Sequence, residues 1–278
     1  KLHTVAVIGP NAISTVALEG NYCGTAGEYH TVYDGIREAL PQTTRVYYAQ
    51  GSHLCLDRVE DLSRNPNDRI SEAVAIASRC ELVILAVGLD QYIEGEEMPG
   101  SKLKTCGDKA DLLLPEGQRA LITAIGQTDV PTIIVNMSGS AIDLADGNDY
   151  AKAIIQAWYP GAEGGRAVAQ LIFGDYSPSG RLPVTFYHND DPMPEFTDYS
   201  MQGRTYRFID YKPLYPFGYG LSYAKFTCEN LQLSAESIAS GDSIDATVTV
   251  RNDSDILAAT PVLFFLRDEE ASTRVPHF

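Results

Sequence analysis

The chain has 278 residues, 44% of them hydrophobic and 21% charged, which is the composition of an ordinary globular protein and excludes a disordered or fibrous one. Its 37 acidic residues outnumber 21 basic ones, and the resulting net charge of −16 excludes a nucleic-acid partner, because phosphate contacts require clustered Lys and Arg. No apolar run is long enough to span a membrane, so a membrane partner is not expected either.

The length exceeds what one hydrophobic core usually organises, so we expect two domains. The chain opens at Lys1 close to a predicted strand, which suggests a piece of a longer protein. Its five cysteines are scattered without a C-x-x-C pair, and its histidines lack ligand spacing. Neither a disulfide framework nor a metal site is predicted, and the cysteines are expected to be reduced packing residues.

Short apolar runs alternate with helix-like segments over the first two thirds of the chain. The runs are rich in Val and Ile and predict five buried strands: Val5–Ile8, Arg45–Ala49, Leu82–Val87, Thr132–Asn136 and Ala153–Trp158. Helical spacing of apolar residues predicts four helices: Val32–Leu40, Asp68–Ser78, Glu116–Ile125 and Ala162–Phe173. This alternation predicts an α/β fold, a mostly parallel sheet sandwiched by helices.

In such sheets the functional loops follow the carboxyl ends of the strands. Here those loops are Gly9–Tyr29, Gly88–Pro115, Met137–Asp146 and Tyr159–Gly165. The turn Gly9-Pro10-Asn11-Ala12 lacks the G-x-G-x-x-G fingerprint, so a nucleotide-dependent α/β protein is disfavoured. The glycine-rich turn Gly161–Gly165 is predicted to pack a helix on a strand rather than to bind an anion.

The densest acidic cluster falls in the loop Gly88–Gly117. Glu94, Glu96 and Glu97 lie close together there. Like charges at short range raise one another's pKa, and a raised pKa is what a general acid needs. The alternative interpretation is a solvated acidic loop.

Beyond this part, Pro178 and Gly180 predict a tight turn into a strand at Leu182–Phe186. From Tyr187 to Lys212 the chain is polar and aromatic and is predicted to be an ordered but irregular connection. After Ala224 the pattern becomes β-only, and we expect strands at Asn230–Leu233, Ser243–Arg251 and Pro261–Leu266.

Two strings in this order, IFGDYSPSGRLPVTF at 172–186 and LYPFGYGLSY at 214–223, resemble the second domain of family 3 glycoside hydrolases, the β-glucosidases and β-xylosidases. The likeness runs from about Thr4 to Tyr223 and implies an α/β sandwich domain at residues 1–223, with 187–223 as its irregular connection. It also implies that residues 224–278 begin a fibronectin type III-like β-sandwich. Such a sandwich needs about seven strands in about 100 residues, so this second domain is expected to be truncated.

The resemblance also implies roles within the acidic loop. Family members carry Glu-x-Glu-Gly-x-Asp-Arg and then a Leu-Pro-Gly-Gln helix start, and their Glu is the acid/base that reaches over to a preceding barrel domain. Glu94 and Glu96 take the two Glu positions, Asp108-Lys109 resembles the Asp-Arg pair after the insertion Met98–Gly107, and residues 114–118 resemble the helix start. Glu96 is the predicted acid/base, with Glu94 its nearest competitor.

Four further residues are candidates for substrate binding. Tyr92, Asn21 and Tyr22 lie on functional loops, where aromatic faces suit sugar rings and polar tips suit hydroxyls. Arg204 either faces the barrel or pins the connection that carries it. Trp158, which is predicted to end a buried strand, is assigned a packing role.

The resemblance therefore implies the C-terminal part of a retaining, exo-acting β-xylosidase or β-glucosidase, acting on an oligosaccharide or aryl glycoside without a cofactor. Retention requires two carboxyl groups about 5–5.5 Å apart, and this chain supplies at most one of them. The nucleophilic Asp is expected on the N-terminal barrel domain of the same parent chain. A non-catalytic carbohydrate-binding or interaction module of the same fold is the alternative. Xylose, glucose and arabinose all remain open as the sugar.

Overall fold

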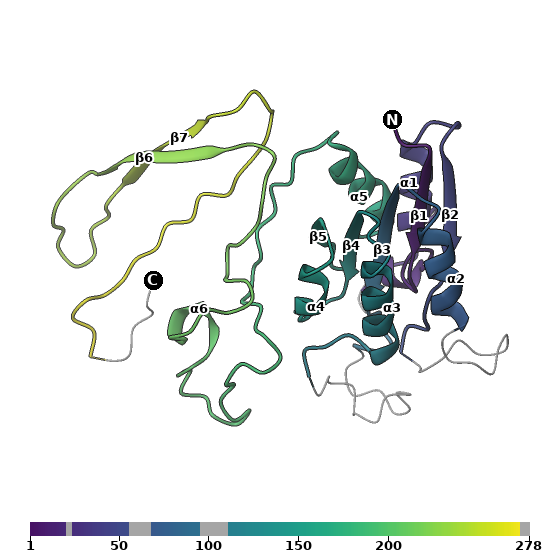
Figure 1. The fold of residues 1–278 in the computed structure, drawn as a ribbon. Coiled ribbons are helices and arrows are strands. Elements are labelled where there is room, and N and C mark those ends of the chain that lie inside the picture. Colours follow the sequence, from purple (N-terminus) through teal and green to yellow (C-terminus); the bar gives the residue numbers. More distant parts are fainter. Residues whose placement is uncertain (21–23, 56–67, 95–110, 273–278) are drawn as a thin grey trace.

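The computed structural model describes residues 1–20, 24–55, 68–94 and 111–272. Its centre is a five-stranded sheet in the order β2-β1-β3-β4-β5, in which every neighbouring pair is parallel. The strands are β1 (Thr4–Ile8), β2 (Arg45–Ala49), β3 (Leu82–Gly88), β4 (Thr132–Met137) and β5 (Ala153–Gln156). The predicted α/β class is therefore confirmed (Figure 1).

Helices cover both faces of the sheet. The longer ones are α1 (Val32–Ala39), α2 (Asp68–Ala77), α3 (Glu116–Gly126) and α5 (Gly164–Phe173), and the short ones are η1 (Val16–Leu18) and α4 (Ala145–Asn148). Helices α1 and α5 pack together on one face, while α2 and α3 pack together on the other. None of the helices in the described part of the chain combines the length and hydropathy that crossing a bilayer requires.

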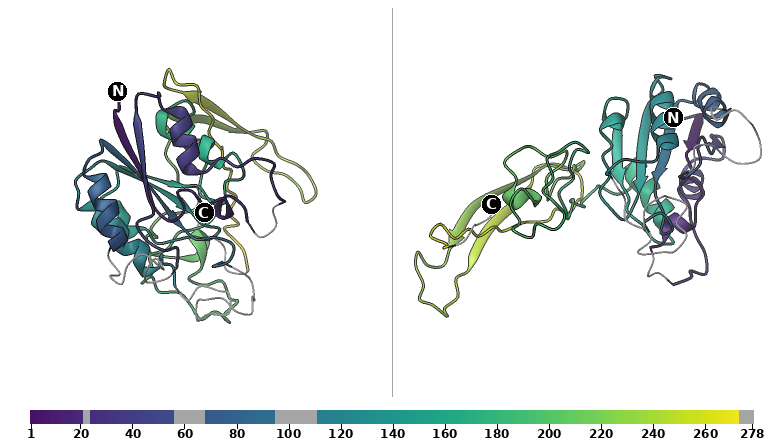
Figure 2. Two further views of the ribbon diagram at one scale, coloured as in Figure 1. Left: turned by 90° about the vertical axis from the view of Figure 1, so that its right-hand side faces the viewer. Right: turned by 90° about the horizontal axis from the view of Figure 1, so that it is seen from below.

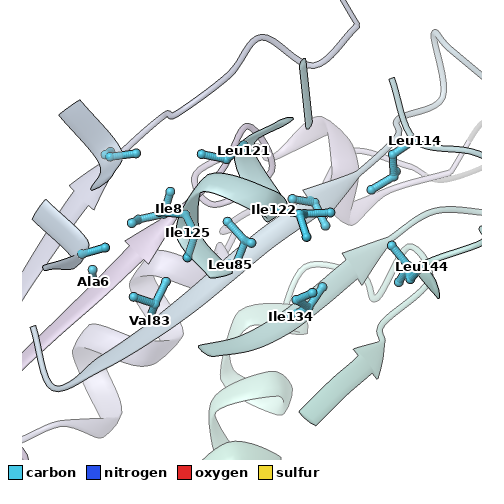
Figure 3. Packing of buried hydrophobic residues seen from close by; sticks show 14 of the residues in the cluster. Ala6, Ile8, Val83, Leu85, Leu114, Leu121, Ile122, Ile125, Ile134 and Leu144 are labelled. Atoms are coloured by element: carbon cyan, nitrogen blue, oxygen red, sulfur yellow. The ribbon is translucent and has the colours of Figure 1, made fainter. Parts of the chain in front are cut away.

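The alternation of side chains along each strand builds two hydrophobic cores. In β1, Val5 and Val7 point to the α1/α5 face, and Ala6 and Ile8 point to the α2/α3 face, all of them fully buried. Both faces of the central strands are covered, so β1 and β3 are almost entirely apolar, whereas the edge strand β2 leaves Arg45 and Tyr47 exposed. Figure 3 shows the α2/α3 core, where Leu121, Ile122 and Ile125 of α3 lie over the strands.

Two glycines allow α1 and α5 to approach each other closely. A Cβ atom on Gly165 would lie 1.8 Å from the Thr31 carbonyl oxygen, and one on Gly35 would lie 2.0 Å from the Gly165 carbonyl oxygen. Only hydrogen atoms fit at both positions, so the glycine-rich turn brings α5 close to α1. Val168 and Ala169 of α5 also lie in the core that includes residues of β1, β3 and β4, so the expected packing of this helix on strands is present beside the helix–helix contact.

Several predicted strand limits differ from the observed ones, most of them by one residue, and the strand predicted to begin at Asn230 begins at Phe226. Strand β5 ends at Gln156, because Trp158 has a φ of 57° and so cannot continue an extended strand. Trp158 instead packs edge-on against Phe186, with ring centroids 6.1 Å apart. The segment Leu182–Phe186 forms an isolated bridge between Phe186 and Tyr215, and Leu182 makes backbone hydrogen bonds with Gly218 and Tyr219, but no regular strand results.

The remainder of the chain lies apart from the sheet (Figure 2). The connection contains the short helix α6 (Thr205–Phe208), and an antiparallel pair follows, formed by β6 (Phe226–Leu233) and β7 (Ala246–Asn252). Residues Pro261–Leu266 are described by the structure but do not form the expected strand. That segment instead contacts the connection, where Phe265 packs edge-on against Tyr206 at 6.4 Å between ring centroids.

Three of the five cysteines, Cys55, Cys80 and Cys228, fall in the described residues. Cys80 is buried in the α2/α3 core and Cys55 packs against that core. Cys228 is exposed on β6, so the expected packing role is wrong for this residue.

Candidate active site

The loops that follow β3, β4 and β5 meet at the carboxyl edge of the sheet around one carboxylate, that of Glu94. Parallel strands place all their carboxyl ends at the same edge, and the strand order reverses direction between β1 and β3. Loops from distant parts of the sequence are therefore brought together where α/β sheets bind their ligands.

The backbone after β3 is fixed by two buried side chains. Gln118, near the start of α3, accepts a hydrogen bond from the Gly88 amide at 2.9 Å and donates to the Gly88 carbonyl at 2.7 Å. Asn11, from the loop after β1, donates to the Leu89 carbonyl at 2.9 Å. Both side chains are fully buried, so strand β3 leaves the sheet in a defined direction.

A tight turn then carries the chain to Glu94. The Asp90 carboxylate accepts hydrogen bonds from the backbone amides of Tyr92, at 2.9 Å, and Ile93, at 3.1 Å. The Glu94 amide donates to the Asp90 carbonyl at 3.0 Å. Aspartate favours such turns because its short side chain reaches its own backbone two and three residues further on.

The carboxylate of Glu94 accepts three hydrogen bonds. Its Oε2 atom accepts from the Gly139 amide at 2.6 Å and from the hydroxyl of Tyr159, and its Oε1 atom accepts from the hydroxyl of Ser140. Gly139 and Ser140 follow β4, and Tyr159 follows β5. We call these four residues the Glu94 cluster.

A polar network inside the sheet holds the β4 side of this cluster. Asn136 is fully buried and donates to Ser138 Oγ at 3.0 Å and to Gln156 Oε1 at 2.7 Å. Ser138 in turn donates to the Ser140 carbonyl at 2.9 Å. The segment Gly139–Ser140, which supplies a backbone amide and a side-chain hydroxyl to Glu94, is thereby tied to β4 and β5.

The charges and burial of the site shift two pKa values. Burial raises the pKa of the Tyr159 hydroxyl far above its usual value, and the hydrogen bond to Glu94 and the charge of that carboxylate raise it further. Tyr159 is therefore always protonated and able to donate. Burial also raises the pKa of Asp90, against the two backbone hydrogen bonds that favour its ionised form, and the charge of Glu94 adds to the increase.

The predicted site residues fall into three groups. Glu96, Asn21 and Tyr22 lie outside the described residues. Tyr92 is 59% exposed on the turn that leads to Glu94, so its ring is accessible to a ligand. Arg204 lies in the connection, where its guanidinium donates to the carbonyls of Glu195 and Asp198 at 2.6 and 3.2 Å, a geometry that favours the pinning role.

The sequence did not connect Tyr159, Ser140 and Gly139 with the acidic loop. All three had been placed on functional loops, and the shared carboxyl edge was a signal that these loops meet. The contacts between these residues and Glu94 depend on the conformations of the loops, and the spacing of residues along the chain does not predict those conformations. In the described residues no group of three or more His, Cys, Asp or Glu could hold a metal ion.

Comparison with known proteins identifies the family. The sequence profile of the glycosyl hydrolase family 3 C-terminal domain matches residues 1–223. The chain belongs to glycoside hydrolase family 3. The resemblance seen in the two strings at 172–186 and 214–223 is thus confirmed.

Relatives of this family 3 chain include a periplasmic β-glucosidase from Salmonella typhimurium, 33% identical over 99% of the chain and 38% of the relative. A xylan 1,4-β-xylosidase from Xylanibacter ruminicola is 41% identical over 75% of the chain and 24% of the relative. The chain thus spans well under half the length of these relatives.

Solved structures of the family share the fold. A β-glucosidase from Erythrobacter marinus superposes with a TM-score of 0.75 at 31% identity, over 90% of this chain and 35% of the other. An exo-β-xylosidase in complex with a xylobiose aziridine activity-based probe superposes with a TM-score of 0.70 at 29% identity, over 83% of this chain and 29% of the other.

Proposed function

We propose that this chain is the C-terminal part of a retaining, exo-acting β-glycosidase, a β-xylosidase or β-glucosidase that hydrolyses terminal non-reducing β-linked sugars. The observation that carries the proposal is the family match over residues 1–223, together with β-glucosidase and β-xylosidase relatives. The acidic segment that begins with Glu94 follows β3 at the carboxyl edge of the sheet, in agreement with a role at a substrate site.

In this proposal Glu96 is the general acid/base. Glu94 supports the assignment indirectly, because its two carboxylate oxygens already accept hydrogen bonds from three protein donors. A general acid must hold a proton on an oxygen that faces the leaving group, within hydrogen-bond reach of it. Of the two Glu positions in the family string, Glu96 is then the one available for the reaction.

The nucleophile would come from an N-terminal barrel domain of the parent protein. Its Asp would attack the anomeric carbon while Glu96 protonates the departing oxygen, and Glu96 would then activate the water that hydrolyses the glycosyl-enzyme. The substrate would be an oligosaccharide or aryl glycoside held between the two domains. Residues 224–278 would belong to a fibronectin type III-like domain.

Glu96→Ala in the full-length parent tests the assignment. We expect kcat/KM for a disaccharide, which has a poor leaving group, to fall by roughly 10²–10⁴-fold, and kcat/KM for an activated aryl glycoside to fall much less. Added azide should restore turnover by attacking the glycosyl-enzyme. The matched control is Glu116→Gln, which removes an exposed carboxylate on α3 and should leave both substrates close to wild type. Wild-type behaviour of Glu96→Ala would refute the role of this residue.

The isolated 278-residue chain provides a second test. It should not hydrolyse aryl β-xylosides or β-glucosides, because retaining chemistry needs both carboxylates. Turnover that disappears on mutating a residue of this chain would contradict a site shared with a barrel. The alternative function, a carbohydrate-binding module, predicts instead that the isolated chain binds xylobiose or cellobiose and that Glu96→Ala does not change the affinity.

A further inference from the structure

The Glu94 cluster joins three loops that are far apart in the sequence. Glu94 is 45 residues from Gly139, 46 from Ser140 and 65 from Tyr159. The cluster is closely packed, since a Cβ atom on Gly139 would lie 2.9 Å from the Tyr159 ring and 3.0 Å from Glu94 Oε2. The same Tyr159 ring is 3.4 Å from a Cβ position on Gly20, so the loop after β1 contacts it as well.

The direction of the hydrogen bonds in the cluster is fixed by chemistry. The Gly139 amide can only donate, and Tyr159 keeps its proton because its pKa is raised. The Glu94 carboxylate accepts from both of them and from Ser140, and hydrogen bonds to a carboxylate are stronger than those between two neutral groups. A carboxylate held in this way is suited to fixing a loop.

We infer that Glu94 is a positioning residue that ties the segment after β3 to the loops after β4 and β5, and so fixes where the chain continues toward Glu96. The inference rests on the proposed function, because it assigns Glu96 the chemistry. Glu96 is two residues further along the chain, and two residues span at most about 7 Å, so the position of Glu94 limits where Glu96 can lie. A misplacement of about 1 Å at a reacting group can reduce the rate about 10²-fold.

The test compares Glu94→Ala with Glu94→Gln in the full-length protein, with xylobiose or cellobiose as substrate. Glutamine keeps the size of the side chain and one acceptor oxygen, and the hydroxyls of Ser140 and Tyr159 can rotate to accept from its amide. We expect Glu94→Ala to lose about 10–10²-fold in kcat/KM and Glu94→Gln to stay within about threefold of wild type. The decrease of kcat/KM at high pH should persist in both variants, because the proposed general acid Glu96 is still present.

Two further changes disturb the cluster without altering the carboxylate. Tyr159→Phe removes one donor, and combining it with Glu94→Ala should add almost nothing to the loss from Glu94→Ala alone, because both changes break the same contact. Gly139→Ala inserts a methyl group between the Tyr159 ring and Glu94 and should also reduce kcat/KM. Tyr150→Phe, before β5 at the opposite edge of the sheet, and Glu116→Gln, exposed on α3, are matched controls that should be silent.

A structural measurement separates positioning from chemistry. The amide hydrogen of Gly139 should exchange slowly in wild type and in Glu94→Gln, and at least tenfold faster in Glu94→Ala. If Glu94→Gln is as defective as Glu94→Ala and the decrease of kcat/KM at high pH disappears, Glu94 is itself the acid/base and the inference is overturned. If Glu94→Ala keeps wild-type kcat/KM while Glu96→Ala is impaired and rescued by azide, the proposed function stands and the positioning role fails.

Discussion

Strands β3 and β7 have the same length, seven residues, but very different surroundings. Every residue of β3 after Leu82 is buried, because helices cover both faces of its sheet. In β7 no residue is buried, and Val250 is 40% exposed. The contrast teaches that a strand pattern specifies extended backbone, while stability depends on the elements that cover the strand.

Amide hydrogen exchange should show the largest difference between the two regions. We expect the amides of β1, β3 and β4 to open only with global unfolding, and those of β6 and β7 to exchange orders of magnitude faster, since a two-stranded sheet is only marginally stable in water. Pairing of the exposed β6–β7 edge with a second copy of the chain would also protect it. Uniformly strong protection of a monomer through residue 272 would contradict the comparison.

Matched leucine substitutions should give the next largest effect. Leu85→Ala, at a fully buried position in β3, should lower the free energy of unfolding by about 2–5 kcal/mol. Leu231→Ala, at a 65% exposed position in β6, should change it by less than about 0.5 kcal/mol. Urea denaturation followed by circular dichroism measures both, and similar losses would show that the β6–β7 pair is covered in solution.

The close approach of α1 and α5 can be tested with a glycine pair. Gly165→Ala should destabilise the protein by about 1–3 kcal/mol, because its methyl group would overlap the Thr31 carbonyl and the helices would have to separate. Gly27→Ala is the control, since nothing lies within 4 Å of its Cβ position. Thermal melts of the two variants should differ by several degrees. An unchanged melting temperature for Gly165→Ala would refute the close contact.

The smallest expected effect concerns the buried charge of Asp90. Burial raises its pKa in the folded state, so its favourable contribution is present below the unfolded pKa of about 3.9 and is lost as the pH rises through the higher folded value. Asp90→Asn keeps an oxygen to accept from Tyr92 and Ile93 but carries no charge. Relative to wild type, this variant should therefore gain stability between pH 4 and pH 7, by less than about 1 kcal/mol. If the stability of Asp90→Asn relative to wild type instead increased as the pH was lowered, the pKa of Asp90 would be lowered in the folded state and the prediction would be wrong.

The sheet could be predicted closely because its strands are recognisable from local composition. All five predicted strands formed, and β2 has the predicted limits. The errors lie where long-range contacts decide the backbone. Trp158 leaves β5 to pack on Phe186, and residues 261–266 contact the connection rather than pairing as a strand. Neither contact leaves a periodic signal in the sequence.

The candidate site, like the fold, was predicted from the sequence only in part. Its location after β3 followed from the parallel sheet, and Glu94 was identified as a candidate from the acidic cluster. Its partners Gly139, Ser140 and Tyr159 were not, since they are at least 45 residues away. The hydrogen bonds of Gln118 to Gly88 were also missed, although residues 114–118 had been compared with the family helix start. A match between two sequences does not show which backbone groups a side chain contacts.

By itself, the sequence determined the class of the protein, the five strands of the central sheet and its four longer helices, and the family. Apolar periodicity and turn residues are local properties, and the two strings at 172–186 and 214–223 are uncommon. Tertiary structure decided how Glu94 is used. A carboxylate in an acidic loop can be solvated, catalytic or fixed, and these states differ only in the groups that surround it. Three donors from the loops after β4 and β5 surround Glu94, and they were brought there by the parallel order of the sheet.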